Sequence, residues 1–273
     1  MKKGVLSTES ALLESREIFE NIYRDYNKRV YVSPDPLQFL YEYDNPLDRE
    51  IVAIIASSLA YGRVAQILKS VKKVLDVLGS SPSDYLKNAT INDFENNLRG
   101  FTHRFTDDKE IVAFLTCISG VLKRGSTLED LFCSHYDGDI KGATELFVSD
   151  FFACGEKDKM YLLPSPANGS ACKRLALFLR WMVREDDVDP GGWKSISPAS
   201  LVIPLDTHMF NICSTLGLCS RKSADAKSVE EITQAFRIIS PNDPVRYDFA
   251  LTRFGIRSEM TVEALFEKWD YKF

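Results

Sequence analysis

Lys173 and Asp206 are the two residues of this chain whose types and surroundings point to chemistry. Each lies at the predicted start of a helix, Lys173 in G-S-A-C-K-R-L-A-L and Asp206 in I-P-L-D-T-H-M-F. A lysine amine can attack an electrophilic carbon and then form a Schiff base. A nearby ionised aspartate can stabilise developing positive charge or relay protons. The pair therefore predicts nucleophilic catalysis at the mouth of a cleft.

Each of these residues also has a simpler interpretation. Lys173 could be a solvated lysine in a first helical turn, where the helix dipole disfavours it. Asp206 could be a helix N-cap, a role that is compatible with catalysis. His208 is more typical of a packed or surface histidine than of a base, and Trp181 is more typical of a core residue. Both remain candidates for a pocket, and so does Arg180.

The residues around Lys173 favour a phosphate-binding segment. Gly169, Ser170 and Ala171 form a short turn that can present backbone N–H groups at a helix N-terminus, where phosphates bind well. Arg174 follows as a candidate phosphate contact. Arg180 and Arg184 leave two interpretations open, phosphate contacts or the solvent-facing side of the helix. Trp181 and Trp193 are candidates for an aromatic face.

Apolar spacing along the chain predicts an all-α protein, since almost no stretch alternates as a strand would. The length allows one large domain or two intimate lobes. A short helix is also expected after Pro34. The other predicted helices cover residues 7–28, 48–67 with an interruption near Gly62, about 71–78, 107–123, 127–136, 140–153, 172–184, 206–216, 227–239, 243–254 and a segment after Thr261.

Composition limits the classes of function. Of the 273 residues 45% are hydrophobic and 27% charged, as in ordinary globular proteins, and the net charge of -5 argues against a general nucleic-acid coat protein. A local basic cleft is still compatible with that charge. The six cysteines form no C-x-x-C pair, so we expect no metal and no cofactor. No apolar run approaches membrane-spanning length, and we expect a cytoplasmic protein without a membrane partner.

Two motifs resemble the helix-hairpin-helix superfamily of DNA glycosylases, typified by endonuclease III and the archaeal oxoguanine glycosylases. Gly169-Ser170-Ala171-Cys172-Lys173 is similar to the G-x-G-x-K hairpin of that superfamily, with Ala171 in place of the second glycine. Ile203-Pro204-Leu205-Asp206-Thr207-His208 is similar to its I-x-V-D-T-H segment. The resemblance is good over about 160–255 and faint over 48–75. It extends to a bacterial branch of the superfamily.

This resemblance implies a fold, an activity and a partner. The fold would be a single domain over residues 1–273 with two intertwined helical lobes around a cleft, the hairpin and catalytic segment lying at about 160–218. Lys173 would be the nucleophile and Asp206 the catalytic aspartate of a glycosylase/AP lyase. The substrate would be double-stranded DNA with an oxidised purine, bound by a monomer.

Two alternatives stay open at this point. The first is a non-catalytic nucleic-acid-binding or repair-scaffold protein that kept the fold and the hairpin; the acidic charge and Ala171 favour it. The second is an all-α interaction module without a nucleic-acid role. It explains the composition but leaves the two motifs as a coincidence.

Overall fold

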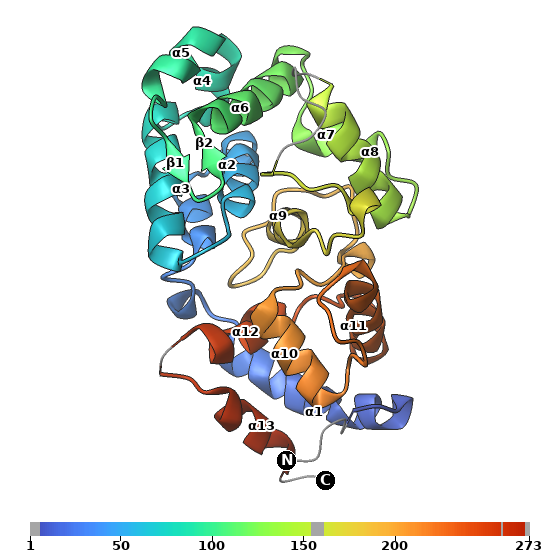
Figure 1. The fold of residues 1–273 in the computed structure, drawn as a ribbon. Coiled ribbons are helices and arrows are strands. Elements are labelled where there is room, and N and C mark those ends of the chain that lie inside the picture. The colour runs from blue at the N-terminus through green and yellow to red at the C-terminus, as the bar shows by residue number, and fades with distance from the viewer. Residues whose placement is uncertain (1–5, 154–160, 258, 271–273) are drawn as a thin grey trace.

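The computed structural model describes residues 6–153, 161–257 and 259–270, and helices dominate this part of the chain (Figure 1). The prediction of a predominantly helical protein is confirmed. The helices are α1 Glu9–Tyr26, α2 Pro46–Ser58, α3 Val64–Leu78, α4 Pro82–Asn88, α5 Ile91–Asn97, α6 Asp108–Lys123, α7 Leu128–Cys133, α8 Ile140–Phe152, α9 Lys173–Val183, α10 Thr207–Leu216, α11 Ala226–Ile239, α12 Asp248–Ile256 and α13 Val262–Asp270. Short 3-10 helices cover Arg29–Tyr31, Pro36–Glu42, Pro166–Asn168 and Pro198–Ser200.

The helices fall into two groups with α9 between them (Figure 1). One group holds α2 to α8, in which α2 contacts α4, α4 and α5 contact α6, and α7 contacts α8. The other holds α1 and α10 to α13, in which α1 contacts α11 and α12, and α10 contacts α12. Helix α9 packs on α2 of the first group.

Helix α2 lies at the centre of its group. Asn45 caps it by accepting a hydrogen bond from the N–H of Leu47 at 2.9 Å, and Pro46 occupies the first turn, where its missing N–H costs nothing. The apolar side chains from Ile51 to Ile55 are fully buried. This burial on all sides agrees with the density of apolar residues in the segment.

Several predicted boundaries were wrong. The interruption near Gly62 separates two helices, α2 and α3, and α3 then continues from Val64 to Leu78 without a second break. Gly62 has a φ of 98°, which no helix accommodates. The helix predicted at 243–254 begins only at Asp248, because residues 240–247 form turns.

Besides three of the short 3-10 helices, three elements were not predicted from the sequence. Helices α4 and α5 have seven residues each, too few to show a periodic stripe. The third is an antiparallel hairpin of β1 (Thr102–His103) and β2 (Thr106–Asp107), in which Thr102 pairs with Asp107 and His103 with Thr106. Strands of two residues carry no alternation pattern, so sequence reasoning could not find them.

Within the described ranges, no helix combines the length and the apolar character that crossing a membrane requires.

Candidate active site

Lys173 and Asp206 lie close together at the starts of two helices. Lys173 is the first residue of α9, and Asp206 is the N-cap of α10. The distance from Lys173 Nζ to Asp206 Oδ2 is 3.6 Å, and the two side chains are 31% and 20% exposed. The second oxygen, Asp206 Oδ1, accepts a hydrogen bond from the N–H of Met209 at 2.8 Å. One carboxylate therefore caps a helix and faces an amine at the same time.

The turn before α9 fixes where Lys173 begins the helix. Gly169 has a left-handed backbone with φ 71°, and Cys172 is also left-handed with φ 44°, which is uncommon for a residue with a side chain. Ser170 Oγ accepts a hydrogen bond from the N–H of Cys172 at 3.2 Å, and the carbonyl of Gly169 accepts one from the N–H of Ala226. These contacts hold the hairpin in one conformation, so the position of Lys173 is set by the backbone.

Both side chains line one cavity of about 460 Å³, a volume typical of small-molecule sites. One face of α9 contributes Lys173, Leu177, Arg180 and Trp181, whose spacing of four, three and one residues is that of a helical stripe. The other walls come from residues 34–36, 60–67, 204–208 and 248–256. The sequence-based expectation that Lys173 and Asp206 share one cleft agrees with this geometry.

His208 and Trp181 also lie on the wall of this cavity. His208 is an exposed residue in the first turn of α10, and it packs so closely against Gly255 that an added Cβ there would lie 2.6 Å from Nδ1. Trp181 is 1% exposed and is a core residue as well as a wall residue. Among the described residues, no hydrogen-bond partner meets Trp181 Nε1 or Asp248 Oδ1, although both residues belong to the cavity wall.

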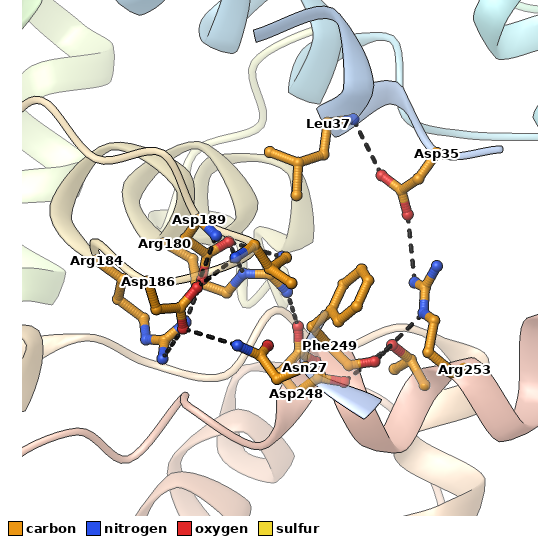
Figure 2. A network of polar contacts seen from close by, with 12 residues as sticks. Asn27, Asp35, Leu37, Arg180, Arg184, Asp186, Asp189, Asp248, Phe249 and Arg253 are labelled. Carbon is orange, nitrogen blue, oxygen red and sulfur yellow. Dashed lines mark hydrogen bonds and ion pairs between the residues drawn. The ribbon is translucent and has the colours of Figure 1, made fainter. Parts of the chain in front are cut away.

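Arg180 and Asp248 on the cavity wall belong to a buried ion-pair network, which we call the floor (Figure 2). Arg180 pairs with Asp189 at 3.1 Å and with Asp248 from α12. Arg184 pairs with Asp189 as well, and with Asp186 at 2.8 Å. Both arginines are 3% exposed. The interpretations of these two residues as phosphate contacts or solvent-facing groups are wrong, because each guanidinium is enclosed by carboxylates of the protein. Arg180 does line the cavity, as expected of a candidate pocket residue.

This network is linked electrostatically to the mouth of the cavity. Burial raises the pKa of Asp248 to about 6, against the lowering effect of the Arg180 guanidinium, and the Asp206 carboxylate raises it further. Asp248 and Asp206 are therefore close enough to repel each other. The charge of Asp206 at the mouth therefore affects the pKa of Asp248 at the floor.

Arg174 holds two aromatic residues beside the hairpin. Its guanidinium donates to the carbonyl of Ser58 at 3.2 Å and to that of Tyr161, and it lies 5.1 Å from the ring centroid of Tyr61 and 4.7 Å from that of Tyr161. Burial lowers its pKa. Sequence reasoning took Arg174 for a phosphate contact and missed these two tyrosines, which lie 113 and 13 positions away from it along the chain.

The predicted nucleic-acid-binding residues border a second, shallower depression of about 320 Å³. Its wall includes Gly169, Ser170, Ala171 and Arg174, together with Tyr61, Tyr161 and Lys173. Tyr61 and Lys173 belong to both hollows. The hairpin and the cavity are thus parts of one continuous surface.

Trp193, the other aromatic candidate, lies elsewhere. It packs on Phe132 and Phe178 and is 3% exposed, and its Nε1 donates to Glu50 Oε2 at 2.7 Å. Glu50 also accepts from the N–H groups of Leu128 and Glu129, at 2.7 and 3.0 Å. Trp193 is therefore a core residue in a brace between α2 and α7, and it does not line the cavity.

The structure places no cluster of three or more His, Cys, Asp or Glu residues suited to a metal ion within its described ranges, and Cys154 lies outside them.

Comparison with known proteins gives one match. A family model described as "Protein of unknown function (DUF2400)" matches residues 35–257, a span that includes the cavity, the ion-pair network and the hairpin. No curated protein and no solved structure matches the chain. Since the match covers far more than half of the 273 residues, the chain belongs to the DUF2400 family.

Proposed function

We propose that this protein is a DNA glycosylase with AP lyase activity, in which Lys173 is the nucleophile and Asp206 assists it. The observation that carries the proposal is the 3.6 Å approach of Lys173 Nζ to Asp206 Oδ2 on the wall of a cavity. Two motifs that lie 33 positions apart in the sequence meet there, as the resemblance to helix-hairpin-helix glycosylases requires. The two groups of helices around α9 would be the two lobes of that fold.

The chemistry follows from the two groups present. In its amine form, Lys173 Nζ forms a bond to C1′ of the deoxyribose while the bond from C1′ to the base nitrogen breaks. The electrons of that bond leave with the base, which takes a proton from solvent. The proton lost by Nζ passes to Asp206 Oδ2. The bond from C1′ to the ring oxygen O4′ then breaks, O4′ takes a proton back from Asp206, and the lone pair of Nζ forms the protonated Schiff base with C1′. A water molecule takes a proton from C2′, a double bond forms between C2′ and C3′, and the bond from C3′ to the phosphate oxygen breaks, so that the 3′ phosphate leaves with the electron pair.

Asp206 has a second task before its proton transfer. As the glycosidic bond stretches, positive charge develops on the sugar, and a carboxylate that is already in position stabilises it without reorganisation. The hydrogen bond from Met209 to Oδ1 keeps this carboxylate in place. Because Oδ2 is not part of the helix cap, it is the oxygen that faces the reaction.

The DNA would lie across the hairpin, with the damaged base turned into the cavity. A base inside a duplex cannot reach Lys173, so it must be flipped out of the stack. The first-turn N–H groups of α9 would face a backbone phosphate, helped by the left-handed residues Gly169 and Cys172 before them. The choice of an oxidised purine comes from the family resemblance alone.

Borohydride trapping tests this function. Wild-type protein is mixed with a duplex that contains an oxidised guanine or an abasic site, and borohydride reduces the imine to a stable bond between protein and DNA. We expect a trapped species of higher mass for the wild type and for Lys194→Ala, a control at an exposed lysine of the same region. Lys173→Ala should give none.

Two other outcomes would change the assignment. Trapping that persists in Lys173→Ala would move the nucleophile to another side chain. DNA binding without trapping or excision across a broad panel of damaged bases would favour the second candidate, a non-catalytic nucleic-acid-binding protein. In that case the contact between Lys173 and Asp206 is an ion pair that joins α9 to α10, a role that its geometry also allows.

A further inference from the structure

Three aromatic side chains form a ladder beside the cavity, which we define as Tyr61, Tyr161 and Phe105. The ring centroids of Tyr61 and Tyr161 are 5.1 Å apart, and those of Tyr161 and Phe105 are 5.3 Å apart, both in edge-to-face contact. Phe105 is 67% exposed and Tyr161 is 46% exposed. Large aromatic side chains that stay in water together mark a contact surface more often than isolated ones do.

Hydrogen bonds between Tyr61 and the β1–β2 hairpin fix the position of the ladder. Phe105 lies at the tip of the β1–β2 hairpin, next to Arg104, whose φ of 53° makes the tight turn. The Tyr61 hydroxyl donates to the carbonyl of His103 at 2.9 Å and contacts Thr106 Oγ1 at 2.8 Å. His103 is fully buried and bonds to the Tyr61 carbonyl. The exposed ring of Phe105 is therefore held in position without a binding partner.

Cations accompany the rings along the ladder. The Arg104 guanidinium lies 5.4 Å from the centroid of Phe105, and Arg174 lies over Tyr161 and Tyr61. Lys173 adds a third positive group where the ladder reaches the cavity, since it lines both hollows together with Tyr61. Alternating aromatic faces and cations suit a ligand that combines flat rings with negative charge, which is the chemistry of a single-stranded nucleic acid.

We propose that the Phe105–Tyr161 end of the ladder is a stacking surface for an unpaired nucleobase, so that the protein prefers DNA with unpaired bases to fully paired duplex. This inference rests on the proposed action on DNA, and it adds the kind of DNA that is bound. A base that has lost its pairing partner exposes its faces, and these can stack on Phe105. Bases inside a regular duplex have no free face to offer, so paired DNA would gain nothing from the ladder.

The test is a binding measurement with undamaged DNA, in which no excision takes place. Fluorescence anisotropy at one fixed salt concentration compares a single strand, a duplex with a one-base bulge and the matched paired duplex. We expect the wild type to bind the first two at least about ten-fold more tightly than the third, because one stacked base contributes on the order of a ten-fold change in affinity. Salt must be held constant, since phosphate contacts dominate the absolute affinity.

Variants locate the effect. Phe105→Ala should weaken binding to the single strand and to the bulged duplex by about ten-fold and leave the paired duplex nearly unchanged. Phe105→Trp should retain the preference because indole also stacks. Leu146→Ala removes another apolar side chain, 50% exposed on α8, and should behave as the wild type. Since Phe105 is mostly in solvent, its replacement should leave the fold intact, which circular dichroism checks.

The outcomes separate this inference from the proposed chemistry. If Phe105→Ala changes none of the three affinities, or changes all three equally, the stacking surface is refuted, and a partner protein becomes the better occupant of these rings. If the stacking surface is refuted while borohydride trapping succeeds, the proposed glycosylase activity is retained without it. If the preference holds while trapping fails, the ladder belongs to a DNA-binding protein. No DNA binding by the wild type would overturn both.

Discussion

The mouth and the floor of the same cavity hold charged residues in opposite ways. At the mouth, Lys173 and Asp206 are partly exposed and meet at 3.6 Å. At the floor, Arg180 and Arg184 are 3% exposed and share the fully buried carboxylate of Asp189. Each charged group of the floor is paired with oppositely charged neighbours. Moving one of these groups would leave another buried charge without its partner. The charges at the mouth are accessible to solvent, whereas those of the floor are enclosed by the protein.

The largest effect that this comparison predicts is on stability and comes from the floor. Asp189→Ala should lower the free energy of unfolding by about 3–5 kcal/mol, because it leaves two buried guanidinium groups without their shared carboxylate. Urea denaturation measures it, and Asp187→Ala, at an exposed aspartate two positions earlier, is the control. A variant of Asp189 within about 1 kcal/mol of the wild type would remove the distinction between floor and mouth.

The next effect concerns the mouth and appears in the rate. Asp206→Asn should slow base excision by ~100-fold, which is about 2.7 kcal/mol of transition-state stabilisation, because the charge is lost. Asparagine caps a helix about as well as aspartate, so the free energy of unfolding should hardly change. Single-turnover excision and urea denaturation of the same preparation separate the two quantities. Equal loss of rate and stability would show that Asp206 is structural.

A third prediction extends the comparison to Glu50, a buried carboxylate that accepts hydrogen bonds from N–H groups. Burial raises its pKa from 4.5 to about 7 in the folded protein. The folded state then binds more protons than the unfolded state between these values, so the stabilisation falls as pH rises from about 4.5 to about 7. The slope from this group is at most about 1.4 kcal/mol per pH unit.

Denaturation at several pH values checks this slope. Glu50→Gln should flatten the curve in that window, since glutamine does not titrate there. Glu145→Gln, at an exposed carboxylate of α8, is the control and should leave the slope in place. A Glu50→Gln curve that keeps the wild-type slope would mean that another group titrates.

The smallest predicted effect is a change in the free energy of unfolding, and it tests whether Lys173 has a structural role. Lys173→Ala should change the free energy of unfolding by less than about 1 kcal/mol, because a partly exposed ion pair contributes little and a cation at a helix N-terminus is unfavourable. Urea denaturation beside Asp189→Ala gives the contrast directly. A loss of 3 kcal/mol or more would assign Lys173 a structural role and would weaken the case for catalysis.

The helices that sequence reasoning located correctly are those whose own residues carry the information. Helices α1, α6 and α11 each bury one side, so their apolar spacing marks them. Helix α12 began later than predicted, because residues 240–247 form turns, among them one from Asp243, whose carboxylate is bound by Arg184 at the C-cap of α9. A local sequence pattern cannot indicate an ion-pair partner 59 positions away. For the same reason, the sequence did not predict that Arg180 and Arg184 are buried.

The candidate site divides in the same way. Lys173 and Asp206 could be singled out because each begins a helix within a recognisable motif. Phe105, Tyr61 and Tyr161 could not, since they come from the turn of the β1–β2 hairpin, the loop between α2 and α3 and the segment before α9. Their side chains form one surface only where these three segments meet in the fold.

Gly255 lies on the cavity wall and packs closely against His208. A single Cβ at this position would lie 2.6 Å from His208 Nδ1 and 3.0 Å from its Cβ, so an alanine there would have to displace the imidazole at the rim. Neither Lys173 nor Asp206 would need to change. A single exchange on α12 would therefore change the rim of the cavity while Lys173 and Asp206 stay as they are.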